Sequence, residues 1–325
     1  MAHLVEKMAY VGAKPWHGIG QDLPPGLSVD EWMIHAGMNW EIKNSPVQFT
    51  SGDSDYLGGL HGFNEHKVLY RSDTQAPLSV VGQRYQVVQP REILEFYRDL
   101  TEQSGFELET AGVLKGGRKL WALANTGQAT TLTGGDTTRG YVLLATACDG
   151  TMATTAQFTS VRVVCNNTLS VALDSGVQAV KVPHRSQFDA QAVKRALGIS
   201  VSSWDEFMYR MKYLSERKVN TAEVSHFAHQ LLVPSESFLN SDEQRISTRT
   251  QRNIGRVIDL FEGQGMGANL ASSQGTAYGL LNAVTQYVDH EQQARSQENR
   301  LNSAWFGAGA NLKQRALNEA LKLVA

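Results

Sequence analysis

The sequence has few cysteines and no long apolar run. Its 325 residues include only two cysteines, Cys148 and Cys165, too few for the disulfide framework of a small secreted domain. The longest apolar segment, residues 141–148, is far shorter than the ~20 residues that a membrane-spanning helix needs. The first ten residues lack the apolar stretch of a secretory signal. We therefore expect a soluble, cytoplasmic protein with no membrane partner.

Motifs of several enzyme classes are also missing. The sequence contains no Gly-Lys dipeptide and therefore no Walker A phosphate loop. It contains neither H-E-x-x-H nor G-x-S-x-G. The glycine-rich residues 263–267 follow a predicted helix rather than a strand, which indicates a loop and not a dinucleotide-binding turn. We therefore predict no cofactor, name no catalytic residue, and expect that the protein is not an enzyme.

The net charge of −2 arises from 30 basic and 32 acidic residues, which are unevenly distributed. Residues 1–150 hold 12 Lys and Arg against 17 Asp and Glu, whereas residues 181–256 hold 12 against 8. Local fields rather than total charge govern binding to phosphates. A near-neutral total therefore does not exclude a nucleic-acid partner. The same distribution also suits ordinary solvated helix faces, or head-to-tail self-association.

The pattern of residues changes near residue 185. Before it, short runs of β-branched and aromatic residues predict strands, and a Gly-Gly turn at residues 115–118 predicts a hairpin. After it, the pattern is almost wholly helical. We predict an α+β fold, with a mixed or antiparallel sheet and helices in residues 1–185 and a mainly helical region in residues 186–325. The predicted strands cover residues 41–49, 67–71, 78–88, 106–115, 118–125, 140–147 and 157–164.

Helix ends are marked by capping boxes and glycines. Ser28 with Glu31 begins one predicted helix, and Pro90 opens another that ends near Gly105. Further capping boxes at residues 203–206 and 241–244 predict two helices, the second ending at residue 263. Apolar residues at helical spacing in residues 275–290 must face a core, and a last helix is predicted over residues 311–323.

Metal ligands are sparse and poorly spaced. There is no C-x-x-C pair, and His226 and His229 would need further ligands from elsewhere. Asp149 follows an apolar strand as part of an Asp-Gly turn, with no second carboxylate nearby in sequence. We therefore predict no metal site. A metal-dependent enzyme of unknown substrate stays as an alternative, with these candidate groups: His17, Asp149, His184, and Asp289 with His290.

Two groups of cations are candidates for phosphate binding. Lys115, Arg118 and Lys119 lie at the predicted hairpin. Four arginines in the predicted helix recur at spacings of 4, 3 and 4, which places them on one face over about 16 Å. Stacked like charges are destabilising unless an anion lies across them. That anion is either a phosphate backbone or an acidic protein surface. The four are Arg245, Arg249, Arg252 and Arg256, and Arg162 is a further candidate that is equally a buried structural arginine.

Four sequence blocks resemble a known family. Residues 15–20 read PWHGIG, residues 80–85 read VVGQRY, residues 162–169 read RVVCNNTL, and residues 281–290 contain NAVT and YVDH after Gly275-Thr276. Together they resemble the phage- and plasmid-borne proteins catalogued as domain of unknown function 932, although Pro90 replaces that family's usual Asn. The resemblance covers residues 10–310. It implies a mobile-element origin and action in the bacterial host cytoplasm, with no settled activity.

The order of predicted elements is also similar to the core of single-strand annealing proteins, the RecT, Redβ and Erf types of phages and the eukaryotic Rad type. In those proteins a curved sheet and a helix line a cationic groove on a ring or filament, and the groove holds single-stranded DNA without ATP. Single strands also need aromatic platforms. The candidate platforms here are Trp121, Tyr141, Phe158 and Trp16.

These observations favour an ATP-independent single-stranded DNA-binding protein that acts in strand annealing or recombination for a phage or plasmid, as a homo-oligomeric ring or filament. The first alternative is a structural or host-interaction protein of a mobile element, whose basic helix meets an acidic protein surface. The second alternative is the metal-dependent enzyme named above. Binding to a single-stranded oligonucleotide over a salt series separates the first hypothesis from both alternatives.

Overall fold

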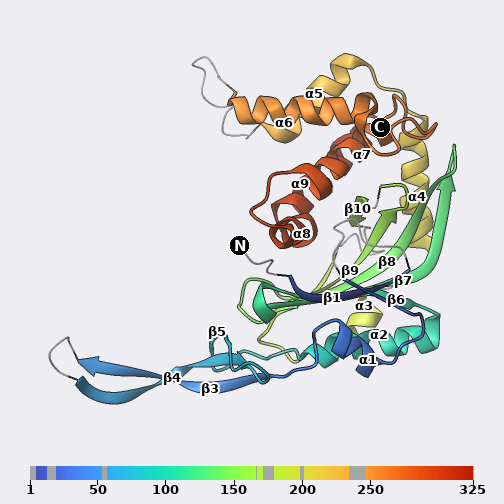
Figure 1. Cartoon of the computed structure of the whole chain (residues 1–325). Coiled ribbons are helices and arrows are strands. Elements are labelled where there is room, and N and C mark those ends of the chain that lie inside the picture. Colours follow the sequence, from blue (N-terminus) through green and yellow to red (C-terminus); the bar gives the residue numbers. More distant parts are fainter. Residues whose placement is uncertain are drawn as a thin grey trace. The chain divides into compact units, whose positions relative to one another are not determined.

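The computed structural model describes residues 5–12, 20–52, 57–165, 167–170, 179–197, 201–233 and 246–324. The chain is α+β, as predicted, with most of its helices in the C-terminal part (Figure 1). The chain divides into two compact units. Unit 1 comprises Met1–Gly127, Tyr141–Phe158 and Ser175–Ile199, and unit 2 comprises Gln128–Gly140, Thr159–Asp174 and Ser200–Ala325. The division falls within three strands, so residues close in sequence belong to different units.

The larger sheet has the strand order β10-β9-β8-β7-β6-β1-β2, and β11 also pairs with β9. Strands β1 and β2 are parallel. The pairs β1 with β6, β6 with β7, β9 with β10 and β9 with β11 are antiparallel. Its strands are β1 (Val5–Val11), β2 (Gln21–Leu23), β6 (Glu107–Leu114), β7 (Lys119–Leu132), β8 (Asp136–Ala147), β9 (Thr154–Arg162), β10 (Asn167–Ser170) and β11 (Val180–Val182).

The core of unit 1 lies where α2 (Pro90–Ser104) packs on this sheet. Its largest buried side chains include Phe96, Tyr97 and Trp121. The Tyr97 hydroxyl donates to the carbonyl of Ala122 at 2.6 Å and to that of Val142 at 3.2 Å. A buried hydroxyl needs such partners, and these two tie the helix to β7 and β8. The other helices of unit 1 are α1 (Val29–His35) and α3 (Ala190–Leu197).

A second, antiparallel sheet has the order β3-β4-β5, also in unit 1. Its strands are β3 (Ile42–Gly52), β4 (Leu57–Arg71) and β5 (Pro77–Gly82). Strand β5 pairs only with the His66–Tyr70 part of β4. The far ends of β3 and β4 therefore form a two-stranded ribbon, which reaches away from the rest of unit 1 in Figure 1.

The predicted hairpin is confirmed, since a one-turn 3-10 helix, η1 (Lys115–Gly117), joins β6 to β7. Gly117 has φ +101°, and an added Cβ would lie 3.0 Å from the Trp40 ring and 3.2 Å from Arg71 Cδ. Only glycine fits both this backbone conformation and this space. The turn is thus packed against Trp40 rather than extended into solvent.

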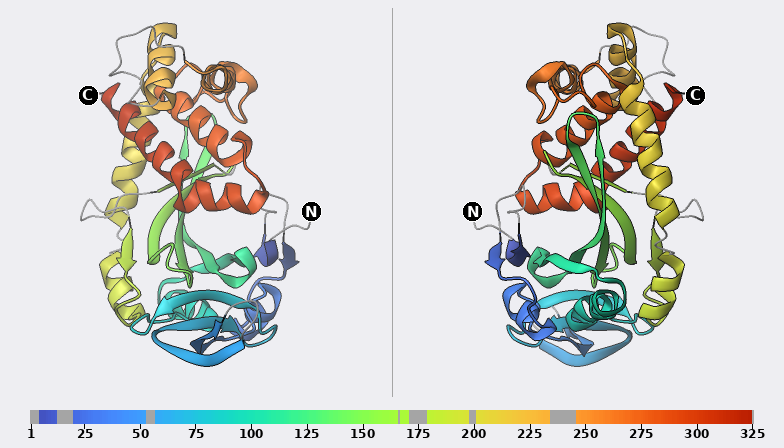
Figure 2. Two further views of the ribbon diagram at one scale, coloured as in Figure 1. Left: turned by 90° about the vertical axis from the view of Figure 1, so that its left-hand side faces the viewer. Right: turned by 90° about the vertical axis from the view of Figure 1, so that its right-hand side faces the viewer.

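The helices of unit 2 pack around α7 (yellow to red in Figure 2). Helix α7 (Ala277–Gln286) is almost entirely buried and contacts α4, α9 and β10. This confirms the core-facing helix predicted at residues 275–290, which continues as η4 (Tyr287–Glu291). The others are α4 (Val201–Glu216), α5 (Thr221–Leu232), α6 (Thr248–Asp259), η3 (Leu260–Gln264), α8 (Gln297–Phe306) and α9 (Ala308–Lys322).

The capping predictions have mixed outcomes. The Ser28 and Glu31 capping box is present and begins α1. The box at residues 203–206 is wrong, because α4 already begins at Val201 and Ser203 lies buried inside it. Asn220 and Glu223 form a capping box on α5 that we did not predict. Residues 241–244 lie outside the described part of the chain. Within that part, no helix has the length and apolar character needed to cross a membrane.

Candidate functional site

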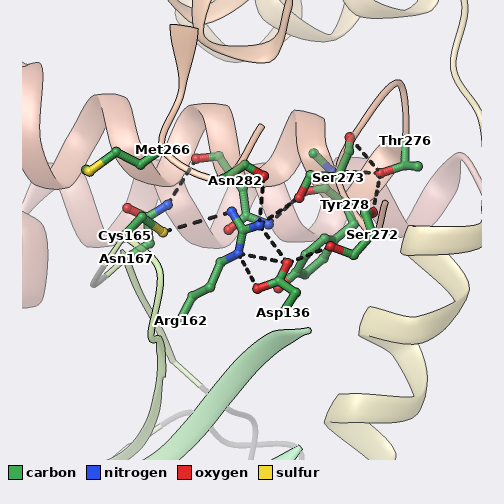
Figure 3. A network of polar contacts seen from close by, with 12 residues as sticks. Asp136, Arg162, Cys165, Asn167, Met266, Ser272, Ser273, Thr276, Tyr278 and Asn282 are labelled. Carbon is green, nitrogen blue, oxygen red and sulfur yellow. Dashed lines mark hydrogen bonds and ion pairs between the residues drawn. The ribbon is translucent and has the colours of Figure 1, made fainter. Parts of the chain in front are cut away.

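A buried ion pair lies at the centre of a polar network in unit 2 (Figure 3). Arg162 is the last residue of β9 and Asp136 the first of β8. Arg162 donates from Nε to Asp136 Oδ1 at 2.8 Å and from Nη2 to Oδ2 at 2.6 Å. The Ser272 hydroxyl donates to the same Asp136 Oδ2 at 2.6 Å. Burial is the largest single influence and lowers the pKa of the Arg162 guanidinium, but the hydrogen bond to Asp136 and the electrostatic effects of Tyr278, Cys165 and Asp136 together outweigh it and leave that pKa raised.

The same guanidinium holds the loop that leads into α7. Arg162 Nη2 donates to the carbonyl of Gly267 at 3.2 Å and to Ser273 Oγ at 2.8 Å. The ring of Tyr278 lies 5.3 Å from the Arg162 Cζ atom, within range of a cation–π contact. Arg162 thus contacts β8, the loop and α7 together, and only 4% of its side chain is exposed to solvent. For Arg162, the sequence left phosphate binding and a buried structural role open, and the structure favours the structural role.

A second buried ion pair joins Asp289 of η4 to Lys313 of α9 at 2.6 Å. The Thr168 amide donates to Asp289 Oδ2 at 2.8 Å, and Lys313 Nζ donates to Thr168 Oγ1 at 2.7 Å. Burial lowers the pKa of Lys313, and the nearby Asp289 carboxylate partly offsets this. This pair ties β10 to two helical elements.

His290 and Asn167 complete the connection. His290 Nε2 lies 3.1 Å from Asn167 Oδ1, and Asn167 Nδ2 donates to Thr285 Oγ1 at 2.9 Å. Burial lowers the pKa of His290. The two sequence blocks at residues 162–169 and 275–290, more than 100 residues apart, therefore meet in one place. The residues that make these blocks distinctive bond to one another.

The space beside this network is small. A pocket lined by Arg162, Asn167, Tyr278 and Asn282, among others, has about 20 Å³ of room. That is enough for about one water molecule, whereas pockets for small organic ligands measure roughly 300–1,000 Å³. The arrangement is suited to joining β8, β9, β10 and α7, and it offers no room for a substrate.

The four arginines predicted to share one helix face differ in their exposure and bonding. Arg249 and Arg252 are exposed. Arg256 is half-buried and pairs with Glu291, with Nη2 donating to Oε1 at 3.0 Å, and it also bonds to Gln264. Arg245 lies outside the described residues. Arg256 thus fixes the base of α6 on η4, and the two outward arginines remain as candidate phosphate ligands.

The cations of the hairpin in unit 1 also differ from one another. Arg118 is exposed and Lys115 is half-buried, with a left-handed φ of 56°. Lys119 is buried with 5% of its surface exposed. Arg118 and Lys115 can reach an anion in solution, whereas Lys119 cannot do so in this arrangement.

The candidate stacking rings are buried. Trp121 is 1% exposed, and Tyr141 and Phe158 also lie in the core. A base cannot stack on a ring that solvent does not reach, so we leave these three out of any binding surface; Trp16 lies outside the described residues. Sequence reasoning placed them at the surface because it noted the aromatic residues and not the apolar neighbours on both sides. Among the described residues, it missed four exposed rings, those of Phe49, Phe63, Tyr209 and Tyr213.

The candidate metal ligands that lie among the described residues have structural partners. Asp149 Oδ1 accepts from the Thr151 amide at 3.0 Å, as expected for a turn. The nitrogens of His184 lie 3.0 Å from the Gln86 carbonyl and 3.1 Å from that of Met152, and its ring stacks on Tyr85. His17 lies outside the described part. In the part that the structure describes, no three His, Cys, Asp or Glu side chains are grouped so as to hold a metal ion.

Comparison with known proteins gives one match. The family model described as "Domain of unknown function (DUF932)" matches residues 77–305. No curated protein and no solved structure matches the chain. The matched region contains both blocks that meet in unit 2, whereas residues 15–20 precede it. Because the match covers well over half of the sequence, the chain belongs to the DUF932 family.

Proposed function

We propose that this protein binds single-stranded DNA without ATP, through the outward face of α6, and promotes strand annealing or recombination for a phage or plasmid. The observation that carries the proposal is the pair Arg249 and Arg252. Both are exposed, and no acidic residue among those described lies within ion-pair distance of either. Within α6, the first acidic residue is Asp259, at its last position.

The geometry of α6 suits a phosphate backbone. Three residues apart on a helix, Arg249 and Arg252 are separated by about 4.5 Å along the axis and lie on nearly the same side. Repulsion between two such cations is relieved when an anion lies across them. Arginine binds phosphate with two parallel N–H donors, which makes it well suited to that anion.

The base of α6 is fixed by bonds that leave this face open. Gln286 Nε2 donates to Glu291 Oε1 at 3.2 Å, and Gln286 Oε1 accepts from the Met266 amide at 2.8 Å. Glu291 in turn holds Arg256. Arg256 is therefore a positioning residue for α6, and Arg162 supports the same loop through Gly267.

Annealing requires little more than a cationic surface. Pairing of complementary strands is itself favourable, by about 1.4 kcal/mol for each stacked step, but the approach of two phosphate backbones is opposed by repulsion that bound cations relieve. The sequence lacks a Walker A motif, in keeping with such an ATP-independent role. In unit 1, Arg118 and Lys115 offer a second cationic group of the same kind.

The proposal is tested by fluorescence anisotropy with a labelled single-stranded oligonucleotide at low salt, followed by an annealing assay with its complement. We expect binding that weakens as salt rises, and faster annealing without ATP. The double variant R249A/R252A should weaken binding. The matched control R139A/R195A removes two exposed arginines elsewhere and should not. Absence of binding at low salt would reject the proposal.

The alternative of a structural or host-interaction protein makes a different prediction for the same face. If α6 meets an acidic protein surface, R249A/R252A should disrupt a protein complex that is indifferent to oligonucleotide. Wild-type protein that forms such a complex, and shows no anisotropy change with DNA, would favour that alternative.

A further inference from the structure

Unit 1 contains two tight turns of the same kind, each of which carries an arginine. In residues 82–85 the amide of the fourth residue donates to the carbonyl of the first at 3.0 Å, and in residues 183–186 the equivalent distance is 2.9 Å. This bond is typical of a β-turn. We call these two segments the twin turns. Arg84 is the third residue of the first turn, and Arg185 is the third residue of the second.

The twin turns are bonded to each other. The Gln86 amide donates to the His184 carbonyl at 2.6 Å, and His184 Nδ1 lies 3.0 Å from the Gln86 carbonyl. The rings of Tyr85 and His184 stack with their centroids 4.4 Å apart. Given the length of the chain between these bonds and the arginines, the Cα atoms of Arg84 and Arg185 lie no more than about 18 Å apart.

Both turns are also anchored to the rest of unit 1. The Tyr85 hydroxyl donates to the carbonyl of Ala147, the last residue of β8, at 2.7 Å. His184 Nε2 lies 3.1 Å from the Met152 carbonyl, and Lys67 of β4 donates from Nζ to the Tyr85 carbonyl at 3.0 Å. A ligand of the twin turns therefore meets a backbone that is already ordered, which lowers the entropic cost of binding.

The two arginines themselves are exposed and have no partner among the described residues. The carboxylates nearest in the structure or the sequence are bonded to backbone amides. Asp149 Oδ1 accepts from the Thr151 amide at 3.0 Å, and Asp189 Oδ1 accepts from the Gln191 amide at 2.9 Å, at the start of α3. Lys181, two residues before the second turn, is exposed as well. No ion pair within the described chain therefore neutralises the positive charge of the twin turns.

The chemistry of the twin turns favours phosphate groups over a protein surface. Arginine binds phosphate with two parallel N–H donors. Neither turn has an exposed large apolar side chain of the kind that anchors a protein interface. Phosphates follow one another along a strand at about 3.4 Å when the bases are stacked, so about five nucleotides span the largest distance between the two arginines.

We propose that the twin turns bind backbone phosphates of single-stranded DNA, with Arg84 and Arg185 each contacting one phosphate. This inference rests on the proposed function and adds a phosphate-binding site that belongs to unit 1. Contacts to phosphate carry no sequence information, so the site accepts any sequence. Tyr85, His184 and Lys67 are positioning residues, because their bonds hold the turns.

The test is fluorescence anisotropy with a labelled single-stranded oligonucleotide over a salt series. We expect R84A/R185A to reduce the slope of log K against log salt by about 1.4, since two phosphate contacts are lost. At 0.1 M salt this corresponds to binding that is about 25-fold weaker. The matched control R139A/R195A removes two exposed arginines outside the twin turns and should keep the wild-type slope. The Tm of each variant confirms that it is folded.

A charge-preserving variant separates the charge of the two side chains from their role in the fold. R84K/R185K keeps both cations but loses the parallel donors of arginine. We expect it to keep the wild-type slope with weaker binding. A slope as low as that of R84A/R185A would overturn the inference, because the loss would then not follow the charge.

The remaining outcomes distinguish this inference from the proposed function. Wild type that binds the oligonucleotide, with an equal slope for R84A/R185A, would overturn the inference and leave the proposed function in place. Wild type that does not bind the oligonucleotide at low salt would overturn both. Labelled poly-glutamate serves as a probe for an acidic protein surface. If R84A/R185A weakens binding of poly-glutamate and not of the oligonucleotide, the inference is overturned in favour of an acidic protein partner.

Discussion

In unit 2, Arg162 differs from Arg249 and Arg252 in burial and in hydrogen bonding, although all three have the same side chain. Arg162 is buried, bonded to Asp136, Gly267 and Ser273, and fixed above Tyr278. Arg249 and Arg252 stand on the outward face of α6. In the first arrangement, the bonds of the arginine hold the strands, the loop and α7 together. The second leaves the charge available to a partner. A basic residue therefore becomes a candidate ligand only once its own partners are known.

The largest expected effect comes from breaking the Arg162 pair. Asp136→Asn leaves a buried guanidinium without its counter-ion, and arginine cannot shed its proton. We expect the free energy of unfolding of the part that contains it to fall by about 3–5 kcal/mol, measured by urea unfolding followed by tryptophan fluorescence. The exposed substitution R139A should change it by less than about 0.5 kcal/mol. Equal losses of unfolding free energy for the two substitutions would mean that the Arg162–Asp136 pair does not stabilise the fold.

The second buried pair should tolerate the same change better. Asp289→Asn leaves Lys313 buried, but burial already lowers the pKa of that lysine, so it can become neutral. We expect a loss of about 2–3 kcal/mol at pH 7, and a smaller loss at pH 9, measured by urea unfolding. A loss that does not change with pH would show that Lys313 keeps its charge.

A smaller effect concerns pH and His290. Burial lowers the pKa of His290 below 6.5, so the unfolded chain takes up this proton at a higher pH than the folded chain does. Stability should therefore be lost as pH falls below about 6.5. The difference in Tm between wild type and His290→Gln should narrow from pH 7.5 to pH 5.5. A constant difference would indicate that His290 does not titrate in this window.

The smallest effect on stability is expected at α6. R249A/R252A removes no ion pair among the described residues and relieves repulsion between two cations. Its Tm should stay within about 2 °C of wild type, equivalent to less than about 0.5 kcal/mol. A large fall in Tm would show that Arg249 and Arg252 stabilise the fold, as Arg162 does.

The sequence was sufficient for the fold class because the strand and helix patterns are local and lie mostly in different parts of the chain. The hairpin at residues 115–118, the Ser28 capping box and the buried helix at residues 275–290 are local features, and all were predicted. The burial of Trp121 and Lys119 was not predicted, and for Arg162 a binding role and a structural role both stayed open, because burial depends on strands that come together from distant positions. Asp136 could not be identified as the partner of Arg162, since 26 residues separate them.

The central claim is that the exposed arginines of α6 bind phosphate while the buried ones do not. It is tested most directly by the slope of log K against log salt for a single-stranded oligonucleotide. Each lost phosphate contact reduces the slope by about 0.7. We therefore expect R249A/R252A to reduce it by about 1.4 relative to wild type, and R139A/R195A to leave it unchanged. Equal slopes for wild type and R249A/R252A would contradict the account.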